Sequence, residues 1–381
     1  MTPKKIGGIW EKEIYFFNKY LKKIYYMKKL EYIWLDGAKP QQIRSKTKIV
    51  KSEWATEDLL RQYKNGKLSA SVWNYDGSST YQAETSKSEL LLMPKNYFLN
   101  PFTKDSIIVV CDVYNVDGTP HITNTRSKMV DTLTKYDDET MYGWEQEYFI
   151  FDNKTNKPLG WPTEGEPREQ GEYYCSVGGN NVSGREFVEE HTDLCIKAGL
   201  AIGGINAEVA LGQWEYQIGT VTAEDGADQL WVSRYILHRL SEKYDYRIEL
   251  DPKPFKGNDW NGSGMHVNFS TKTIREDKVN KKEIAIEMCK KLEEKHAEHI
   301  AVYGENNDAR LTGANETSSI KDFGWGIGDR TKSIRIPSTI NDPNAIGYIE
   351  DRRPASNGDP YLIVDRMVRT ILQDVEILEE N

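Results

Sequence analysis

Short apolar runs separated by turn residues fill the first third of the chain. These runs occur in YIWLDG, TKIVKSEW, ASVWNYDGSS, SELLLMP and SIIVVCDVYNVDGTP, and Asp-Gly pairs begin at Asp76 and Asp117. Short apolar runs bounded by such pairs are typical of strands joined by tight turns. The pattern therefore predicts a small sheet domain from Leu30 to about Arg126.

Longer stretches with helical spacing follow, and strand-like segments rich in ionisable residues lie between them. The spacing predicts helices over 126–136, 184–199, 224–244, 281–303 and 360–379. No internal repeat or low-complexity segment occurs in the sequence. The predicted fold class is therefore α+β, with a small sheet domain at residues 30–126 and a larger domain at residues 127–381.

Residues 1–29 are expected to be an N-terminal extension. Ile14, Phe17, Leu21 and Ile24 recur at helical spacing with lysines between them, which predicts a basic amphipathic helix. Such a helix suits a membrane-surface or targeting element, or a segment docked on its own or a neighbouring subunit. Alternatively, Met27 is the natural start, because MKKLEYIWLDG already has the pattern of a domain beginning.

The composition excludes several classes of protein. The formal net charge of −9 argues against a general surface for nucleic acid or anionic membranes. The mean hydropathy is −0.67, and no apolar run approaches the roughly 18 residues of a membrane span. The four cysteines show no C-x-x-C spacing. Reduced thiols in a cytoplasmic protein are therefore expected.

Two glutamates stand two residues apart in the apolar run GWEQEYFIFD, at Glu145 and Glu147. Residues i and i+2 of a strand point to the same face, so both carboxylates are expected to face one cavity. Two such anions about 4 Å apart repel by roughly 4 kcal/mol at an effective dielectric near 20, so a buried pair needs protons or cations. The alternative is a solvated strand face.

Further ligand-type residues occur at Glu208 and Glu215 in NAEVALGQWEYQIG, at His266 in NGSGMHVNFS and at Glu350 in YIEDRRP. Polar and apolar residues alternate in MHVNFS, so a strand there would present His266 on a polar face. Carboxylates with one imidazole suit Mg²⁺ or Mn²⁺, and zinc is not expected without a Cys or a second His partner. The alternative is that His266 is a core histidine that forms hydrogen bonds within the protein and binds no metal.

The chain has no P-loop, so the phosphates of a nucleotide would have to be bound by other groups, and arginine side chains are the candidates. GNDWNGSG is rich in glycine, but no Lys follows it and it leads into a strand. Guanidinium groups bind carboxylate and phosphate oxygens through paired hydrogen bonds. Surface ion pairing is the alternative for any one of them. The candidates are Arg310, Arg330, Arg335, Arg352 and Arg353.

The motifs together resemble a known family. WNYDGSST, GWEQEYF, GEYYCSVG, NAEVALGQWEYQIG, NGSGMHVNFST, RLTGANETSS, SIRIP and YIEDRRP match, in order, the pattern of eukaryotic-type glutamine synthetases, from about Leu30 to Leu372. The resemblance implies ATP-dependent ligation of ammonia to the γ-carboxylate of L-glutamate through γ-glutamyl phosphate. The products are L-glutamine, ADP and phosphate.

The resemblance also implies two divalent metals, Mg²⁺ or Mn²⁺, with ATP as co-substrate. Metals neutralise phosphate charge, and arginines stabilise a phosphoryl group in transfer. One metal would be held by Glu147, Glu208 and Glu215, and the other, which bridges the nucleotide phosphates, by Glu145, His266 and Glu350.

An ammonium pocket follows from the same resemblance. Asp76 in WNYDGSS matches the residue that binds ammonium and takes its proton, since the free cation has no lone pair with which to attack. Ser79, Tyr174 and Glu208 would line this pocket. A plain turn residue is the alternative for Asp76. Glu316 in NETSS matches a flap carboxylate that closes over the reactive intermediate and excludes water.

Substrate and nucleotide residues are carried over in the same way, motif by motif. Glutamate would be contacted by Asn261, Gly262, Arg310 and Arg352. ATP would be contacted by Ser270, Arg330, Arg335 and Tyr348, and Arg330 is also expected to act in catalysis.

The resemblance implies a β-grasp domain followed by a catalytic α+β domain with an antiparallel sheet. It also implies a homo-oligomer of two stacked pentameric rings, with active sites between subunits and Asp76 supplied by a neighbour. Two positions depart from the family pattern. Asn315 stands where His is usual, and Asp329 stands where Asn is usual before Arg330. A ligase for an amine or polyamine and a non-catalytic relative are the rival interpretations.

Overall fold

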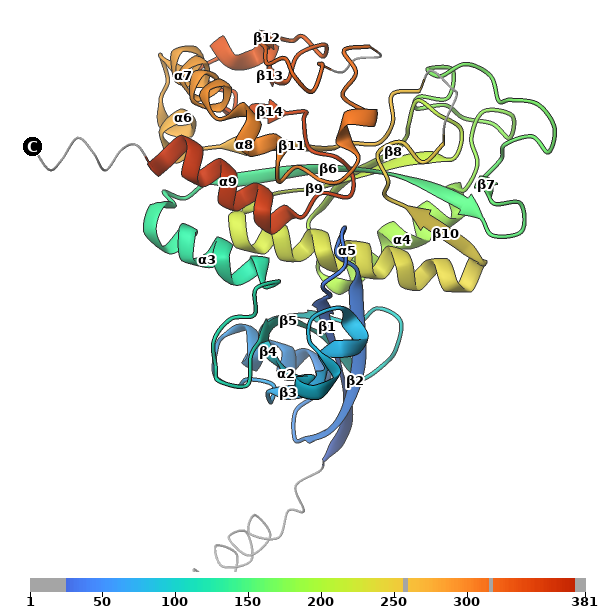
Figure 1. Ribbon diagram of the computed structural model, residues 1–381, viewed down its shortest axis with the longest axis vertical. Coiled ribbons are helices and arrows are strands. Elements are labelled where there is room, and N and C mark those ends of the chain that lie inside the picture. The colour runs from blue at the N-terminus through green and yellow to red at the C-terminus, as the bar shows by residue number, and fades with distance from the viewer. Residues whose placement is uncertain (1–24, 256–259, 315–317, 374–381) are drawn as a thin grey trace, which may run out of the picture.

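The computed structural model describes residues 25–255, 260–314 and 318–373. The expected helix at the N-terminus, Asn315 and Glu316 lie outside the described residues. Two sheets organise the described chain, and the long helix α5 (Ala223–Tyr244) crosses between them (Figure 1). The predicted α+β class, a small sheet domain followed by a larger one, is confirmed.

The first sheet has five strands in the order β2-β1-β5-β4-β3. Strands β1 and β5 are parallel and central, and the other neighbours are antiparallel. Helix α2 packs on one face, which is the arrangement expected of a β-grasp domain. The elements are β1 (Tyr26–Leu35), β2 (Ile43–Ser52), α2 (Thr56–Lys64), β3 (Trp73–Asp76), β4 (Glu89–Leu99) and β5 (Ser106–Tyr114).

Alternation along β1 buries both faces of this sheet. Tyr32 packs with Leu59 and Tyr63 of α2 in one core, whereas Ile33 packs with Val232 and other residues of α5 in a second core. Successive strand residues point to opposite faces, so the small domain is fixed to the large one through β1. Strand β1 begins at Tyr26, which is earlier than the boundary expected at residue 30.

The second sheet runs in the order β12-β13-β14-β11-β6-β9-β8, and β10 and β7 also pair with β6. Its pairs are antiparallel except β12 with β13. Its strands are β6 (Met141–Asp152), β7 (Lys157–Pro158), β8 (Ile202–Ala207), β9 (Gln213–Thr222), β10 (Tyr246–Glu249), β11 (Met265–Ser270), β12 (Trp325–Ile327), β13 (Ile334–Ile336) and β14 (Ile349–Asp351).

Helices cover one face of this sheet (Figure 1). Trp144, Tyr148 and Tyr216 point from the strands into a core shared with α5 and α9. The polar residues that alternate with them along the same strands face the other side of the sheet. The remaining helices are α3 (Thr125–Tyr136), α4 (Arg185–Ala198), α6 (Lys272–Glu276), α7 (Lys281–Glu294), α8 (His296–Ile300) and α9 (Pro360–Leu372).

Two predictions of secondary structure were wrong. Helix α2 lies in a region predicted to hold only strands and turns, although Leu59 and Tyr63 have the spacing of one helix face. The single helix predicted over 281–303 breaks at Lys295, where φ is −106° and ψ is 16°. These angles lie outside the α-helical region, so the chain turns between α7 and α8.

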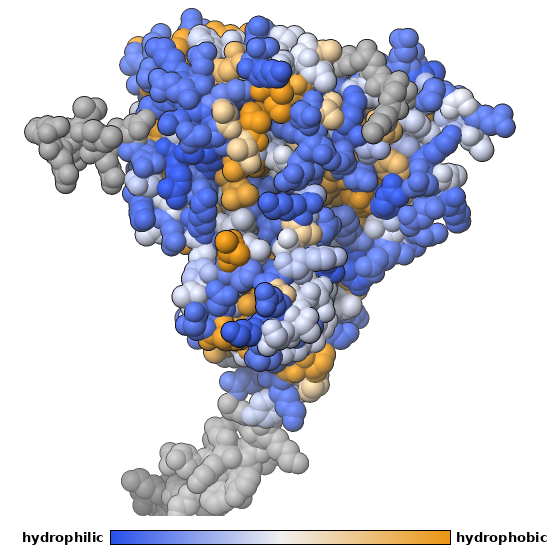
Figure 2. Space-filling view, viewed as in Figure 1, coloured by the Kyte–Doolittle hydropathy of each residue, from blue (hydrophilic) through white to orange (hydrophobic). Residues whose placement is uncertain are grey.

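Most residues on the face shown in Figure 2 are polar, and apolar residues gather in a narrow band down its middle. Among the described helices, none combines the length and the apolar character that crossing a bilayer requires.

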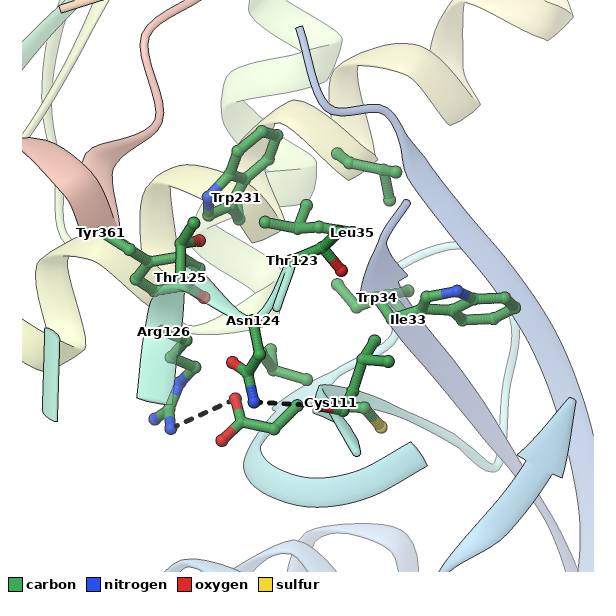
Figure 3. Close-up of a pocket in the computed structure, with 14 residues that line it drawn as sticks. Ile33, Trp34, Leu35, Cys111, Thr123, Asn124, Thr125, Arg126, Trp231 and Tyr361 are labelled. Carbon is green, nitrogen blue, oxygen red and sulfur yellow. Dashed lines mark hydrogen bonds and ion pairs between the residues drawn. The ribbon is translucent and has the colours of Figure 1, made fainter. Parts of the chain in front are cut away.

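At the junction between the domains, Arg126 lines a pocket together with Trp231 and Tyr361 (Figure 3), and it forms a buried ion pair with Asp228. The Arg126 Nε and Nη2 atoms donate to Asp228 of α5 at 2.8 and 2.9 Å. Asp228 also accepts from Asn96 of β4 at 2.9 Å and from the Tyr361 hydroxyl of α9 at 2.7 Å. This one carboxylate therefore joins elements of both domains.

We expect Arg126→Met to lower the free energy of unfolding by about 3–5 kcal/mol, because it leaves the Asp228 carboxylate buried without its cation. Chemical denaturation would measure the change. Lys290→Met is the control, since Lys290 and Glu287 form an exposed pair at 3.3 Å that contributes little. Equal stability of the two variants would contradict the role given to the junction.

Candidate active site

Strand register brings the predicted carboxylates of β6 and β9 together. Glu147 pairs directly with Glu215, and Glu145 pairs with Gln217. Side chains of directly paired residues lie on the same face of a sheet. The residues that alternate with them point the other way, and Trp144, Tyr148 and Tyr216 among these enter the apolar core. The expectation that Glu145 and Glu147 face one cavity is therefore met.

The row of ionisable residues continues across the sheet in the other direction. His266 of β11 pairs with Glu145, Asn268 pairs with Glu350 of β14, and Glu350 pairs with Arg335 of β13. The polar face that the alternation in MHVNFS predicted is therefore continuous over five neighbouring strands.

The ligand-type atoms form two groups, in each of which the atoms lie within 4.8 Å of one another: Glu147, Glu208 and Glu215, and Glu145, His266 and Glu350. The His266 Nδ1 atom lies 3.4 Å from Glu145 Oε2 and 3.6 Å from Glu350 Oε1. Its Nε2 atom lies 3.8 Å from Glu147 Oε1, so the imidazole stands between the groups. These are the two sets named from the resemblance.

All residues of the two groups except the fully buried Glu350 line one cavity of about 470 Å³, which is the size of a small-molecule site. Its lining also includes the glycine and asparagine segment before β11 and four arginines. The lining residues are Glu145, Glu147, Gly171, Tyr174, Asn206, Glu208, Val209, Glu215, Gln217, Asn261, Gly262, His266, Arg310, Arg330, Arg335 and Arg352.

Charge is crowded in the first group. Burial, and then the charge of Glu147, raise the pKa of Glu208 to about 8 and that of Glu215 to about 9. Near neutral pH both carboxyls therefore hold protons unless cations replace them. An all-carboxylate group with this property fits Mg²⁺ or Mn²⁺.

The second group already contains compensating partners. Burial opposes ionisation of Glu145, but hydrogen bonding and charge from His266, with a hydrogen bond from Asn268, outweigh it and lower the pKa of Glu145 to about 2. Asn268 Nδ2 donates to Glu145 at 2.8 Å. Three carboxylate or imidazole ligands fit a metal that accepts one nitrogen.

Arginines surround the same cavity, and Glu350 orients two of them. The Arg352 Nη1 atom donates to Glu350 at 2.7 Å, and Arg335 Nε donates to the other oxygen. The buried Arg352 Nε atom has no hydrogen-bond partner among the described residues, so it can serve a ligand. Arg310 donates to the carbonyls of residues 352, 353 and 354 at 2.7–3.0 Å. Burial lowers its pKa to about 10.

The segment before β11 approaches the acids through its backbone. Gly262 has φ of +78°, and a Cβ there would lie 2.3 Å from the Pro252 carbonyl oxygen, so only glycine fits. The Gly264 N–H donates to Glu147 at 2.8 Å. Gln213 Nε2 donates to the Gly262 carbonyl at 3.0 Å. The segment is therefore held against the first acid group.

Some predicted site residues lie away from this cavity. Asp76 and Ser79 are exposed in the small domain and are not among its lining residues. Ser270 is buried and donates its hydroxyl to the Gly347 carbonyl, and neither Ser270 nor Tyr348 lines the cavity. Glu316 lies outside the described residues.

The unusual Asp329 has a local explanation. Its carboxylate accepts hydrogen bonds from the Thr331 backbone at 2.9 Å and from the Thr331 hydroxyl at 2.7 Å. These bonds lower the pKa of Asp329. The carboxylate therefore caps its own turn, and no ion pair joins it to Arg330 within the described chain.

Several amides at the cavity were not predicted. Gln217 Nε2 donates to Glu215, Asn206 Nδ2 donates to Glu208 at 2.9 Å, and Gln213 Nε2 reaches Glu147 at 3.3 Å. Gln213 and Gln217 stand two residues on either side of Glu215, so the same period of two would have found them. The partner of Asn206 depends on the turn after β8.

Comparison with known proteins agrees with this site. Residues 124–376 match the family model described as glutamine synthetase, catalytic domain. The chain belongs to the glutamine synthetase family. Glutamine synthetase of Yarrowia lipolytica is 46% identical over 358 residues, covering 92% of this chain and 93% of that protein. The Arabidopsis thaliana glutamine synthetase cytosolic isozyme 1-5 is 43% identical over 346 residues, covering 90% and 94%.

The fold has a solved counterpart. A cryo-electron microscopy structure of Plasmodium falciparum glutamine synthetase matches with a TM-score of 0.71 at 16% identity, covering 100% of this chain and 77% of that one. The predictions of the family, of the α+β fold and of a glutamate–ammonia ligase are confirmed.

We expect the metal-free protein to lose stability as pH rises from 6 to 9. The pKa values of Glu208 and Glu215, about 8 and 9 in the folded chain, exceed the value of 4.5 for a free glutamate. Their contribution to stability is thus complete below pH 4.5 and is lost as pH passes through 8 and 9. The melting temperature should fall by roughly 5 °C or more over this window.

Saturating Mg²⁺ should remove most of this fall, because it favours the ionised carboxylates. Glu215→Gln should flatten the pH dependence of the metal-free protein and weaken the Mg²⁺ effect, whereas Glu287→Gln, at an exposed position, should change neither. If the melting temperature of Glu215→Gln fell with pH as steeply as that of the unmodified chain, Glu215 would not be a source of the pH dependence.

Proposed function

We propose that this chain joins ammonia to the γ-carboxylate of L-glutamate in a reaction driven by ATP, with the cavity between β6, β9, β11 and β14 as its active site. The observation that supports this most directly is that alternate residues of a single strand, β6, contribute to two different ligand groups. Glu145 belongs to one group and Glu147 to the other. Two adjacent cation sites beside arginines suit the transfer of a phosphoryl group to a carboxylate.

The proposed metals are Mg²⁺ or Mn²⁺, held by the two groups already described. When bound, they would neutralise phosphate charge and polarise the transferring phosphoryl group. The protein supplies a fixed arrangement of ligands, because Asn206, Gln213, Gln217 and Asn268 donate hydrogen bonds to the carboxylates. Such donors orient the ligands before any ion binds.

The four arginines that line the cavity are assigned to two substrates. Arg310 and Arg352, with Asn261 and Gly262, are proposed to hold L-glutamate at the buried end of the cavity. Their guanidinium and amide donors suit its carboxylates.

Arg330 and Arg335 are proposed to bind the phosphates of ATP, and Arg330 is exposed at the cavity edge where a nucleotide can enter. Ser270 and Tyr348 remain predictions for the nucleotide side, and Glu316 remains the predicted flap residue.

The ammonium pocket is proposed to form between subunits of a homo-oligomer of two stacked pentameric rings. Asp76 lies on the small domain, outside the cavity that contains Tyr174 and Glu208. Hydrogen bonds from the hydroxyls of Ser78 and Ser79 lower the pKa of Asp76 to about 2. The group is therefore an anion that attracts ammonium. It becomes a better base when a neighbouring subunit replaces these hydrogen bonds.

A cytoplasmic location is proposed, because one of the relatives is named a cytosolic isozyme.

Phosphate release from ATP tests the reaction. We expect release with Mg²⁺ to require both L-glutamate and ammonium, and γ-glutamyl product to form with ammonium in clear preference to methylamine. Glu215→Ala should abolish turnover, because it removes a ligand from the first group. A preference for methylamine, or release that is independent of glutamate, would contradict the proposal.

Mixing two inactive variants tests the shared site. Asp76→Asn and Glu215→Gln should each be inactive alone, whereas co-assembled in equal amounts they should regain activity at about a quarter of the sites, if one subunit supplies Asp76 and the next supplies Glu215. Unmixed samples at the same total concentration are the control. A mixture no more active than its components would show that Asp76 and Glu215 act within one chain.

A further inference from the structure

Two side-chain amides join the loop that follows β7 to the segment that precedes β11. The Asn261 backbone N–H donates to Gln170 Oε1 at 2.7 Å, and Gln170 Nε2 donates to Asn261 Oδ1 at 3.2 Å. Asn261 lines the active-site cavity, and Gln170 stands directly before Gly171, which also lines it. Gln170 was not among the residues that the sequence motifs indicated.

The backbone N–H fixes the orientation of both amides. It can only donate, so the oxygen of Gln170 must face it, and the Gln170 NH₂ group must then face Asn261. That NH₂ group requires an acceptor, so the oxygen of Asn261 is turned toward Gln170. The NH₂ group of Asn261 is consequently on the opposite side, where no described residue accepts a hydrogen bond from it.

Both partners are anchored, so the pair keeps this geometry. The Gly171 N–H donates to the Val209 carbonyl at 2.8 Å, next to the ligand residue Glu208. On the other side, the Ser263 N–H donates to the Pro252 carbonyl at 2.8 Å. Gln213 holds the Gly262 carbonyl. The amide pair thus connects the segment of the first acid group with the segment assigned to glutamate.

We propose that Gln170 is a positioning residue that sets the polarity of Asn261, so that an N–H donor faces the cavity and binds a carboxylate of L-glutamate. This rests on the proposed function, because the carboxylate is that of the proposed substrate. The donor acts beside the guanidinium groups of Arg310 and Arg352, which suit the same ligand. An Asn261 with the opposite orientation would present an oxygen and repel the carboxylate.

Gln170→Glu is the sharpest test, because it keeps the shape and removes the donor. The new carboxylate accepts from the Asn261 backbone and also attracts the Asn261 NH₂ group, so the amide turns and its oxygen faces the cavity. The KM for glutamate should rise about tenfold or more, which corresponds to the loss of a hydrogen bond to a charged group. The kcat should stay within about threefold and the KM for ATP should not change, since the reacting groups are untouched.

Asn180→Asp is the matched control, because it makes the same amide-to-acid change at an exposed position of the same loop. It should leave the KM for glutamate unchanged. Gln170→Met removes the constraint without reversing it, so its KM should lie between those of the unmodified chain and Gln170→Glu. Melting temperature and oligomeric state would be measured for each variant.

The outcomes separate this proposal from the proposed function. An unmodified chain without glutamate-dependent turnover would overturn both. An active chain in which Gln170→Glu keeps its KM for glutamate, or in which Gln170→Glu and Gln170→Met lower kcat equally, would overturn the role of Gln170 alone. If Gln170→Glu does not fold, Asn261→Asp presents an oxygen to the cavity directly and should raise the KM for glutamate in the same way; an unchanged KM there would also overturn it.

Discussion

Mutual repulsion among carboxylates on one face of a sheet is the constraint around which this molecule is built. Glu145 and Glu147 of β6, Glu215 of β9 and Glu350 of β14 share this face, with Glu208 beside them, and most are buried. Burial raises the free energy of each anion, and closeness raises it further. Donor amides, arginines and, in the proposed reaction, metal ions offset this cost. The fold therefore keeps the carboxylates close together despite their repulsion, and this arrangement favours the binding of cations.

The opposite face of the same strands provides the rigidity that this requires. Gln146, between the two glutamates, is fully buried and accepts from Arg234 of α5 at 2.7 and 2.9 Å. Arg234 also donates to the carbonyls of Ser356 and Gly358 at 2.9 Å. One residue of the helix layer thus fixes β6 and the segment after β14 together. Strands β6, β9, β11 and β14 each contribute packed side chains to one face and at least one ligand-type residue to the other, which is why core and site cannot be altered independently.

The sequence anticipated much of the site because its signals are local. A period of two in GWEQEYFIFD and MHVNFS sufficed to predict which side chains share a face, and ordered motifs indicated the family. The helix α2 was missed, since the pattern over residues 30–126 was interpreted as short strands and turns only. The break at Lys295 was missed because the apolar spacing continues through it. Gln170 and Asn206 carry no periodic signal, and their partners are fixed by loop geometry.

By itself, the sequence determined the alternation of strands, the identity of the ligand-type residues, the family and the reaction class, since each depends on residue types at short spacings. Only the tertiary structure decided the register that places Glu147 opposite Glu215 and His266 opposite Glu145, because register depends on pairing between segments far apart in the chain. It also decided that Asp76 lies outside the cavity and that Asn261 turns its amide oxygen toward Gln170. Both follow from packing between distant segments, which no local pattern encodes.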